Sequence, residues 1–206
     1  MEYRVSSITS LYSTSSSLSS SSSESSSIVS FLIKSCGLSQ NEALFVSNQI
    51  KSQTTSQPDS VVELFENYGF TKPYISKIIT KQPSFLLYDP FKTLKPKLDF
   101  FNSKGLHGIE LADFISKNPT ALMVSLKSQL ILSFDILKNI LHTDTDVITA
   151  LKASYRVLNV NVLEKMMANL EVLRYEGVPP FTIAKFLIKE PRVFMGNAEK
   201  FKNIVE

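Results

Sequence analysis

The stretch Lys81-Gln82-Pro83-Ser84-Phe85-Leu86-Leu87 decides the fold, because related stretches recur along the chain at a nearly constant interval. The related stretches begin with Lys117-Asn118-Pro119, Lys152-Ala153-Ser154 and Lys189-Glu190-Pro191. With Ser154 placed at the proline position, the proline slots lie 36, 35 and 37 residues apart (119 − 83, 154 − 119, 191 − 154). This period indicates a repeat protein in which each unit is one supersecondary motif.

Two further features keep the same register. A glycine followed by an apolar residue stands 14 residues before each true proline, whereas the third unit has Ile140-Leu141 at that place. The glycine pairs are Gly69-Phe70, Gly105-Leu106 and Gly177-Val178. A short hydrophobic cluster follows each slot, as Phe85-Leu86-Leu87 follows Pro83. The agreement of these features indicates that the repeats begin near residue 58.

Each unit is predicted to be a pair of helices. In the first unit, Thr71 can cap a helix that ends at Pro83, because proline has no amide hydrogen to donate and disfavours helix at the residue before it. The second helix ends at Gly105, which adopts the left-handed conformation easily. The apolar stripes comprise Ile75, Ile78, Ile79, Leu94, Leu98 and Phe101 in the first unit, and Ile183, Phe186 and Leu187 in the last. A pair cannot bury such a face alone, so stacked units must form the core of an all-α solenoid.

The N-terminal segment has a different composition. Residues 1–30 contain 16 serines, with Arg4 as the only basic residue and Glu2 and Glu24 as the only acids. Such a segment cannot bury enough apolar surface to fold, and we expect it to be disordered. A Ser-rich, acid-poor N-terminus is typical of an organelle transit peptide, and a generic disordered tail is the alternative. We expect a mitochondrial destination, with the chloroplast as the alternative.

The remaining chain divides into two parts. Residues 31–57 are predicted to form N-terminal helices and a linker, with Ser39 and Glu42 as the capping box of one helix. Residues 58–206 form the repeat array. The chain stops partway through a unit, so we expect an array truncated at its C-terminus.

The composition excludes several classes of function. The net charge is only +3, so binding to a polyanion has to depend on where the cations lie. The single cysteine, Cys36, cannot form an internal disulfide, and no Cys/His cluster suggests a zinc site. His107 and His142 have no acid or cysteine at ligand spacing, and the sequence has no phosphate-binding loop or nucleophile elbow. We expect no cofactor, no metal, no small-molecule substrate and no membrane span, and we predict that the protein is not an enzyme.

These motifs resemble those of a known family. The glycine-apolar opening, the signature Pro-x-x-apolar-apolar at Pro83, Pro119 and Pro191, and the order of units from Ser35-Cys36-Gly37-Leu38-Ser39 onward are similar to the plant branch of the mitochondrial transcription termination factor (mTERF) family. The resemblance covers about residues 31–206. It implies a right-handed α-solenoid whose positively charged face holds duplex DNA in organelle gene expression, with some members acting in RNA processing.

Six cations are the candidate binding residues. A lysine stands two positions before every proline slot, and equivalent positions in a solenoid stack into a line that can follow a phosphate backbone. These residues are Lys81, Lys117, Lys152 and Lys189. The helix macrodipole explains them equally well, because it favours a lysine in the last turn of any helix. Arg156 and Arg192 follow the slots and can reach the same edge, although each can also be an ordinary surface residue.

Three functions fit these observations. We predict a monomeric protein that binds double-stranded DNA and regulates or terminates organellar transcription. The first alternative is an RNA-binding factor in organellar RNA processing or splicing, although the residues in register are proline, glycine, lysine and apolar groups, which do not encode bases. The second alternative is a protein-binding helical scaffold.

Overall fold

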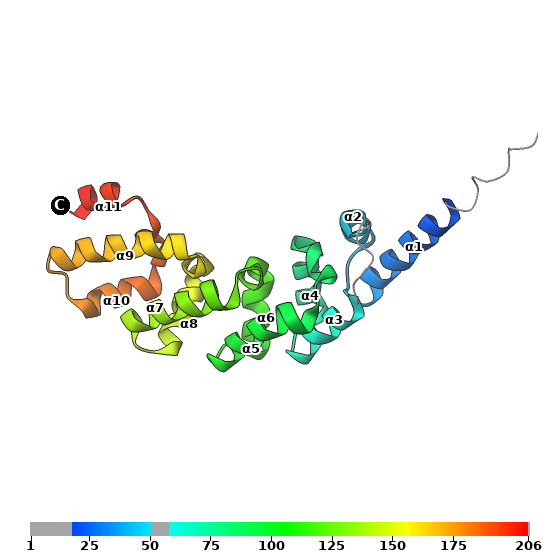
Figure 1. Ribbon diagram of the computed structural model, residues 1–206, viewed down its shortest axis with the longest axis horizontal. Coiled ribbons are helices and arrows are strands. Elements are labelled where there is room, and N and C mark those ends of the chain that lie inside the picture. The colour runs from blue at the N-terminus through cyan, green and yellow to red at the C-terminus, as the bar shows by residue number, and fades with distance from the viewer. Residues whose placement is uncertain (1–17, 51–57, 206) are drawn as a thin grey trace, which may run out of the picture.

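The computed structural model of the chain describes residues 18–50 and 58–205. Every regular element in these two ranges is a helix, and Figure 1 shows the helices following one another in an elongated array. The all-α helical-repeat fold expected from the sequence is confirmed. None of the helices in the described ranges is long and apolar enough to cross a lipid bilayer.

Three helices precede the main repeats: α1 (Leu18–Lys34), α2 (Gln40–Ile50) and α3 (Pro58–Asn67). The predicted capping box is present at the start of α2. The Ser39 amide donates a hydrogen bond to the Glu42 carboxylate at 2.8 Å, and the Glu42 amide donates to the Ser39 hydroxyl at 3.4 Å. Both orphan donors at this helix end are therefore satisfied by the residues that the sequence indicated.

Helix α1 differs from the predicted disorder of residues 1–30, because residues 18–30 belong to this helix. Its C-terminal half packs against α2, where Leu32 is fully buried. This packing supplies the helical nucleus, and extending a helix through serines costs at most about 0.7 kcal/mol per residue. Residues 1–17 and the expected linker at 51–57 lie outside the described residues.

Each following unit contains three main elements instead of the predicted pair of helices. We call these elements, in chain order, the A helix, the 3-10 helix and the B helix. The A helices are α4 (Lys72–Lys81), α6 (Gly108–Lys117), α8 (Asp144–Ala153) and α10 (Pro180–Lys189). The 3-10 helices are η1 (Pro83–Leu87), η3 (Pro119–Leu122), η5 (Tyr155–Leu158) and η6 (Pro191–Met195). The B helices are α5 (Lys95–Ser103), α7 (Leu132–Leu141), α9 (Val160–Tyr175) and α11 (Ala198–Val205), and π-helical turns at η2 (Pro90–Leu94) and η4 (Leu126–Ile131) precede the first two.

The hydrophobic cluster after each proline forms the additional element. Pro83 begins η1, and Phe85 and Leu86 are fully buried. Proline suits the first position of a helix because its amide would be unpaired there and its φ is already helical. The same residue therefore ends one helix and begins the next.

The structure corrects the register of the third unit. The A helices begin at residues 72, 108, 144 and 180, so the period is 36 residues throughout. The 3-10 helices begin at 83, 119, 155 and 191, so Tyr155 occupies the proline position that we assigned to Ser154. The equivalent of Lys81, Lys117 and Lys189 is therefore Ala153, and Lys152 lies one residue earlier. One residue rotates a side chain by about 100° around a helix, so Lys152 points in a different direction.

The junctions between units use the left-handed conformation. Gly69, Gly105 and Gly177 have φ angles of 84°, 89° and 76°. The third unit has no glycine at this junction, and His142 takes the left-handed conformation with a φ of 72°. His107, by contrast, is the N-cap of α6 with extended backbone. The two histidines are therefore not equivalent, although they stand at similar places in the sequence.

Buried polar side chains link successive units at one repeated position. Lys97, Ser133 and Asn169 lie 36 residues apart on the B helices and are all buried. Each donates a hydrogen bond to a backbone carbonyl 25 residues further on, in the 3-10 helix of the next unit. The acceptors are the carbonyls of Leu122, Leu158 and Phe194, at 2.6, 3.1 and 2.8 Å. These bonds fix how each unit is oriented on the next.

The A helices do not all pack equally closely. Helix α4 packs on α6 and α8 packs on α10, whereas the contact between α6 and α8 is weaker. At the C-terminal end, Phe186 of α10 is 56% exposed, which contradicts the prediction that it belongs to the core. Its equivalents Ile78 and Phe114 are buried because the next unit covers them, and no A helix follows α10 in the residues described.

Candidate nucleic-acid interface

Lys81 joins two units. Its ammonium group donates hydrogen bonds to the carbonyl oxygens of Ser116 at 2.9 Å and Lys117 at 3.1 Å. These carbonyls belong to the last turn of α6, where backbone acceptors have no partner within the helix. Lys81 thus caps the neighbouring helix, and the ends of α4 and α6 lie side by side as expected for stacked positions.

Lys117 forms an ion pair within its own helix. Its ammonium lies 2.6 Å from the Asp113 carboxylate, one turn earlier, and 69% of the lysine side chain remains exposed. An exposed pair of this spacing contributes only about 0.3–0.5 kcal/mol, so the lysine remains available to another anion.

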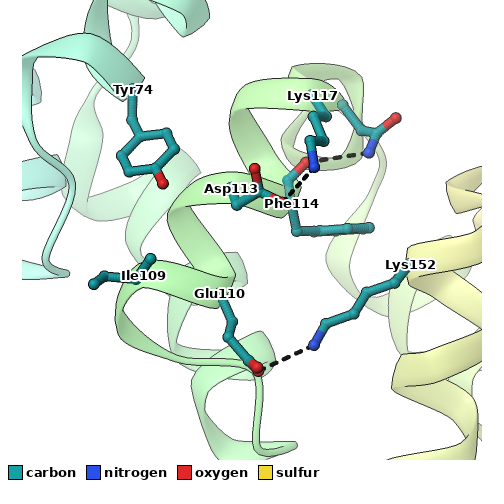
Figure 2. Close-up of a pocket in the computed structure, with 8 residues that line it drawn as sticks. Tyr74, Ile109, Glu110, Asp113, Phe114, Lys117 and Lys152 are labelled. Atoms are coloured by element: carbon teal, nitrogen blue, oxygen red, sulfur yellow. Dashed lines mark hydrogen bonds and ion pairs between the residues drawn. The ribbon is translucent and has the colours of Figure 1, made fainter.

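Lys152 reaches from α8 back to α6. Its ammonium lies 3.0 Å from the Glu110 carboxylate, as the dashed line in Figure 2 shows. This direction follows from the corrected register, because Lys152 is rotated away from the position that Ala153 occupies at the helix end. Lys81 therefore contacts backbone carbonyls, whereas Lys117 and Lys152 contact carboxylates.

The other three candidate cations are free. Lys189, Arg156 and Arg192 are exposed, and none of their side chains has an ion pair or hydrogen-bond partner among the residues that the structure describes. Arg156 and Arg192 are the second residues of η5 and η6, 36 residues apart, so they occupy equivalent positions. Ser84 and Thr120 hold this position in the first two units. The alignment of the repeats that placed Ser154 at the proline slot hid this equivalence, because it shifted Arg156 by one residue relative to Arg192.

A hollow of about 370 Å³ lies along the A helices at the weak contact between α6 and α8. Figure 2 shows Tyr74 of α4, several residues of α6 and Lys152 of α8 around it. The lining residues are Tyr74, Ile109, Glu110, Asp113, Phe114, Lys117, Asn118 and Lys152. Two candidate lysines, Lys117 and Lys152, are thus brought together at one site, beside two carboxylates.

Sequence reasoning missed Glu110 and Asp113. The spacing of Asp113 four residues before Lys117 is a recognisable helical ion pair and could have been found. The pair between Glu110 and Lys152 spans 42 residues and depends on how two units stack, so no local pattern reveals it.

A second charged group crosses three units. Asp144, at the start of α8, lies 2.7 Å from the Lys138 ammonium on α7 and 3.7 Å from the Lys104 ammonium at the end of α5. The hydrogen bond from Lys138 is the main cause that lowers the pKa of Asp144, and the charges of Lys104 and Lys138 add to it. This group links units mechanically and does not line the hollow.

The described residues offer no evident reactive group. They contain no cluster of three His, Cys, Asp or Glu side chains that could hold a metal ion. Cys36 is buried, and burial raises the pKa of its thiol to about 12, which keeps it protonated and unreactive at neutral pH.

Comparison with known proteins agrees with the fold. The family model for mTERF matches residues 62–205, which is well over half of the chain and includes all four A helices. A search of curated proteins found no match. The chain therefore belongs to the mTERF family, a family of nucleic-acid-binding helical-repeat proteins of organellar gene expression and not a known family of enzymes.

Proposed function

We propose that this protein binds double-stranded DNA through the edge where its A helices meet the 3-10 helices, and that it regulates or terminates transcription in an organelle. The observation that carries the proposal is a cation at this edge in every unit. Lys81, Lys117 and Lys189 end their A helices. Arg156 and Arg192 lie in η5 and η6, three residues beyond the ends of α8 and α10 (156 − 153, 192 − 189). Family membership supports a nucleic-acid partner.

Phosphate contacts are the chemistry that this edge suits best. Lysine provides a point charge and arginine can form two parallel hydrogen bonds to one phosphate. The contact of Lys81 with the carbonyl of Lys117 brings the edges of the first two units together, which supports a track of cations across these two units. Because the net charge is only +3, affinity has to come from this local concentration of cations.

A salt titration tests the proposal. The full chain is titrated with a DNA duplex, an RNA duplex and a single-stranded RNA, all of the same sequence. Each titration is repeated over a range of KCl concentrations. We expect duplex DNA to bind most tightly, with log K falling linearly against log [KCl] at about 0.9 per phosphate contact. If none of these nucleic acids bound the chain more tightly than it binds a basic peptide of equal charge, the proposal would be wrong. The protein-binding scaffold would then be the leading function.

Charge-neutralising variants locate the interface. Lys189→Gln and Arg156→Gln should each weaken duplex binding. Each should also reduce the slope of log K against log [KCl] by about 0.9, the amount expected for one phosphate contact. Lys165→Gln is the matched control, since Lys165 is exposed on α9 and has no ion-pair partner among the described residues. Equal losses in all three variants would show that only the overall charge matters.

One observation favours the RNA alternative. Tyr175 is 89% exposed and Phe181 is 70% exposed, and the Lys185 ammonium lies 4.4 Å from the centre of the Phe181 ring. Exposed aromatic rings beside a lysine suit stacking of unpaired bases. If the single-stranded RNA bound more tightly than the duplex and Phe181→Ala removed that preference, RNA processing would become the leading function.

We further propose that the protein acts as a monomer in mitochondria, with chloroplasts as the alternative destination. The serine content of residues 1–30 supports import into an organelle. Deleting residues 2–17, which precede α1, should abolish import of a fluorescent fusion without removing any described helix. Light scattering at several protein concentrations measures the molar mass, which should remain that of a single chain.

A further inference from the structure

Helix α6 carries two carboxylates at the hollow, at positions where α4 and α10 carry neutral or basic residues. Asp113 of α6 occupies the position held by Lys77 on α4 and Lys185 on α10, in a period of 36 residues. Glu110, one turn earlier, takes the position of Tyr74 on α4 and Thr182 on α10. On α8 these two positions hold Thr149 and Asp146. Among the four A helices, α6 alone has carboxylates at both positions, although the Glu110 position is also acidic on α8.

Both carboxylates are paired with candidate binding lysines. Asp113 lies 2.6 Å from the Lys117 ammonium, and Glu110 lies 3.0 Å from the Lys152 ammonium. All four side chains line the same hollow, and each is 40–69% exposed. A phosphate could reach both lysines only by displacing the carboxylates or by lying beside them.

We propose that Glu110 and Asp113 mask Lys117 and Lys152 in the free protein, and so limit the affinity for nucleic acid and its dependence on salt. This inference rests on the proposed function. When a phosphate displaces the carboxylate, the freed carboxylate attracts a cation from solution, so the net release of cations is smaller than for the contact of a free lysine. After displacement, the two carboxylates remain close to the phosphates and repel them.

The mask has to be weak if nucleic acid is to displace it. Both ion pairs are exposed to solvent, where such pairs contribute little and are screened by salt. Lys152 also has to extend across the weak contact between α6 and α8 to reach Glu110, so bending that opens this contact separates the pair. Binding and bending at this place are therefore coupled.

Neutral isosteres of the two carboxylates test the inference. Glu110→Gln and Asp113→Asn keep the shape of the side chain and remove the charge, so we expect each to tighten duplex DNA binding by about twofold to fivefold at low salt. The salt slope should become steeper by up to about 0.9 for each lysine released.

Matched controls separate unmasking from a change in net charge. Glu164→Gln on α9 and Asp135→Asn on α7 make the same chemical changes at exposed carboxylates that have no ion-pair partner among the described residues. In addition, Asp113→Asn should gain no more than its control when it is made in a Lys117→Gln protein, because no lysine is left to unmask.

The outcomes distinguish the inference from the proposed function. If the wild-type chain binds neither duplex DNA nor RNA at the lowest salt concentration, the proposed function fails. If the wild type binds but Glu110→Gln and Asp113→Asn behave like Glu164→Gln and Asp135→Asn, the proposed function stands and the mask is refuted.

Discussion

Single buried polar residues control how the units of this protein are joined. Lys97, Ser133 and Asn169 are chemically unlike one another, yet each donates to a carbonyl in the next unit from the same repeat position. What the position requires is a hydrogen-bond donor of any kind. Aligning the repeats of this chain reveals positions with similar residues. It does not reveal a position whose residues share only the ability to donate a hydrogen bond, so this link could not be predicted.

Asn169 offers the sharpest test of these links. Its side-chain amide donates to the carbonyls of Phe194 at 2.8 Å and Gly196 at 3.1 Å, and the residue is fully buried. Asn169→Ala leaves both carbonyls without this donor, and we expect it to lower the free energy of unfolding by about 1–3 kcal/mol. Urea denaturation measures the change. Asn139→Ala, at an exposed position on α7, is the control and should change stability by less than about 0.5 kcal/mol.

The order of elements was predictable, and their number in each unit was not. The period of about 36 residues, the prolines after three of the four A helices and the glycines at three junctions were all visible in the sequence. The 3-10 helix was not, because four or five apolar-rich residues have no periodicity of their own. The apolar pair Val157-Leu158, which matches Phe85-Leu86 in position, could have revealed that Tyr155 and not Ser154 stands at the proline slot.

The junction before α8 carries conformational strain that a substitution can release. His142 is exposed and holds a φ of 72°, a conformation that costs a residue other than glycine about 1–2 kcal/mol. His142→Gly should raise the free energy of unfolding by about 0.5–1 kcal/mol, since the gain is partly offset by the greater freedom of glycine in the unfolded chain.

The converse substitution checks the cause. Gly105 has a φ of 89° and no atom within 4 Å of the place where a Cβ would lie, so Gly105→Ala changes only the backbone energy. It should destabilise the protein by about 1 kcal/mol. Thermal unfolding of the two variants beside the wild type would show opposite shifts, and shifts of the same sign would contradict this account.

At the scale of the whole molecule, stability depends on contacts between units, because no unit buries its apolar face alone. Asp144 contributes one such contact by linking α8 to Lys138 and Lys104. Its pKa is lowered in the folded protein, chiefly by the hydrogen bond from Lys138. A lowered pKa means that the stabilisation is fully present above the unfolded pKa of about 3.9 and is lost as the pH falls through the folded value.

Replacing Asp144 should therefore change how the free energy of unfolding depends on pH at acidic pH. Asp144→Asn should reduce the free energy of unfolding by about 0.5–1 kcal/mol at pH 7, since the group is about one third exposed. The difference from the wild type should shrink as the pH is lowered below 4. Chemical denaturation at a series of pH values measures it, and a difference that stayed constant down to pH 2 would show that the charge is not the cause.

The directions of the lysine side chains belong to this scale as well. The sequence placed a cation at every unit edge, but Lys81 caps a neighbouring helix while Lys117 and Lys152 bind carboxylates. The partners of Lys81 and Lys152 lie in another unit, whereas Asp113 lies one turn before Lys117 on the same helix. The contacts of Lys81 and Lys152 depend on the stacking of units and could not be predicted. The pair between Lys117 and Asp113 follows from helical spacing and could have been predicted.

The cost of removing a core aromatic should depend on whether a unit follows it. Phe114 and Phe186 occupy the same position of their A helices in the 36-residue register, but Phe114 is 2% exposed and Phe186 is 56% exposed. Phe114→Ala opens a cavity among well-packed neighbours and should lower the free energy of unfolding by about 3–5 kcal/mol. Phe186→Ala removes mostly solvent-exposed surface, so less than about 1 kcal/mol should be lost. Urea denaturation of both variants decides the matter, because equal losses would mean that α10 is covered in solution by a surface that the described residues do not include.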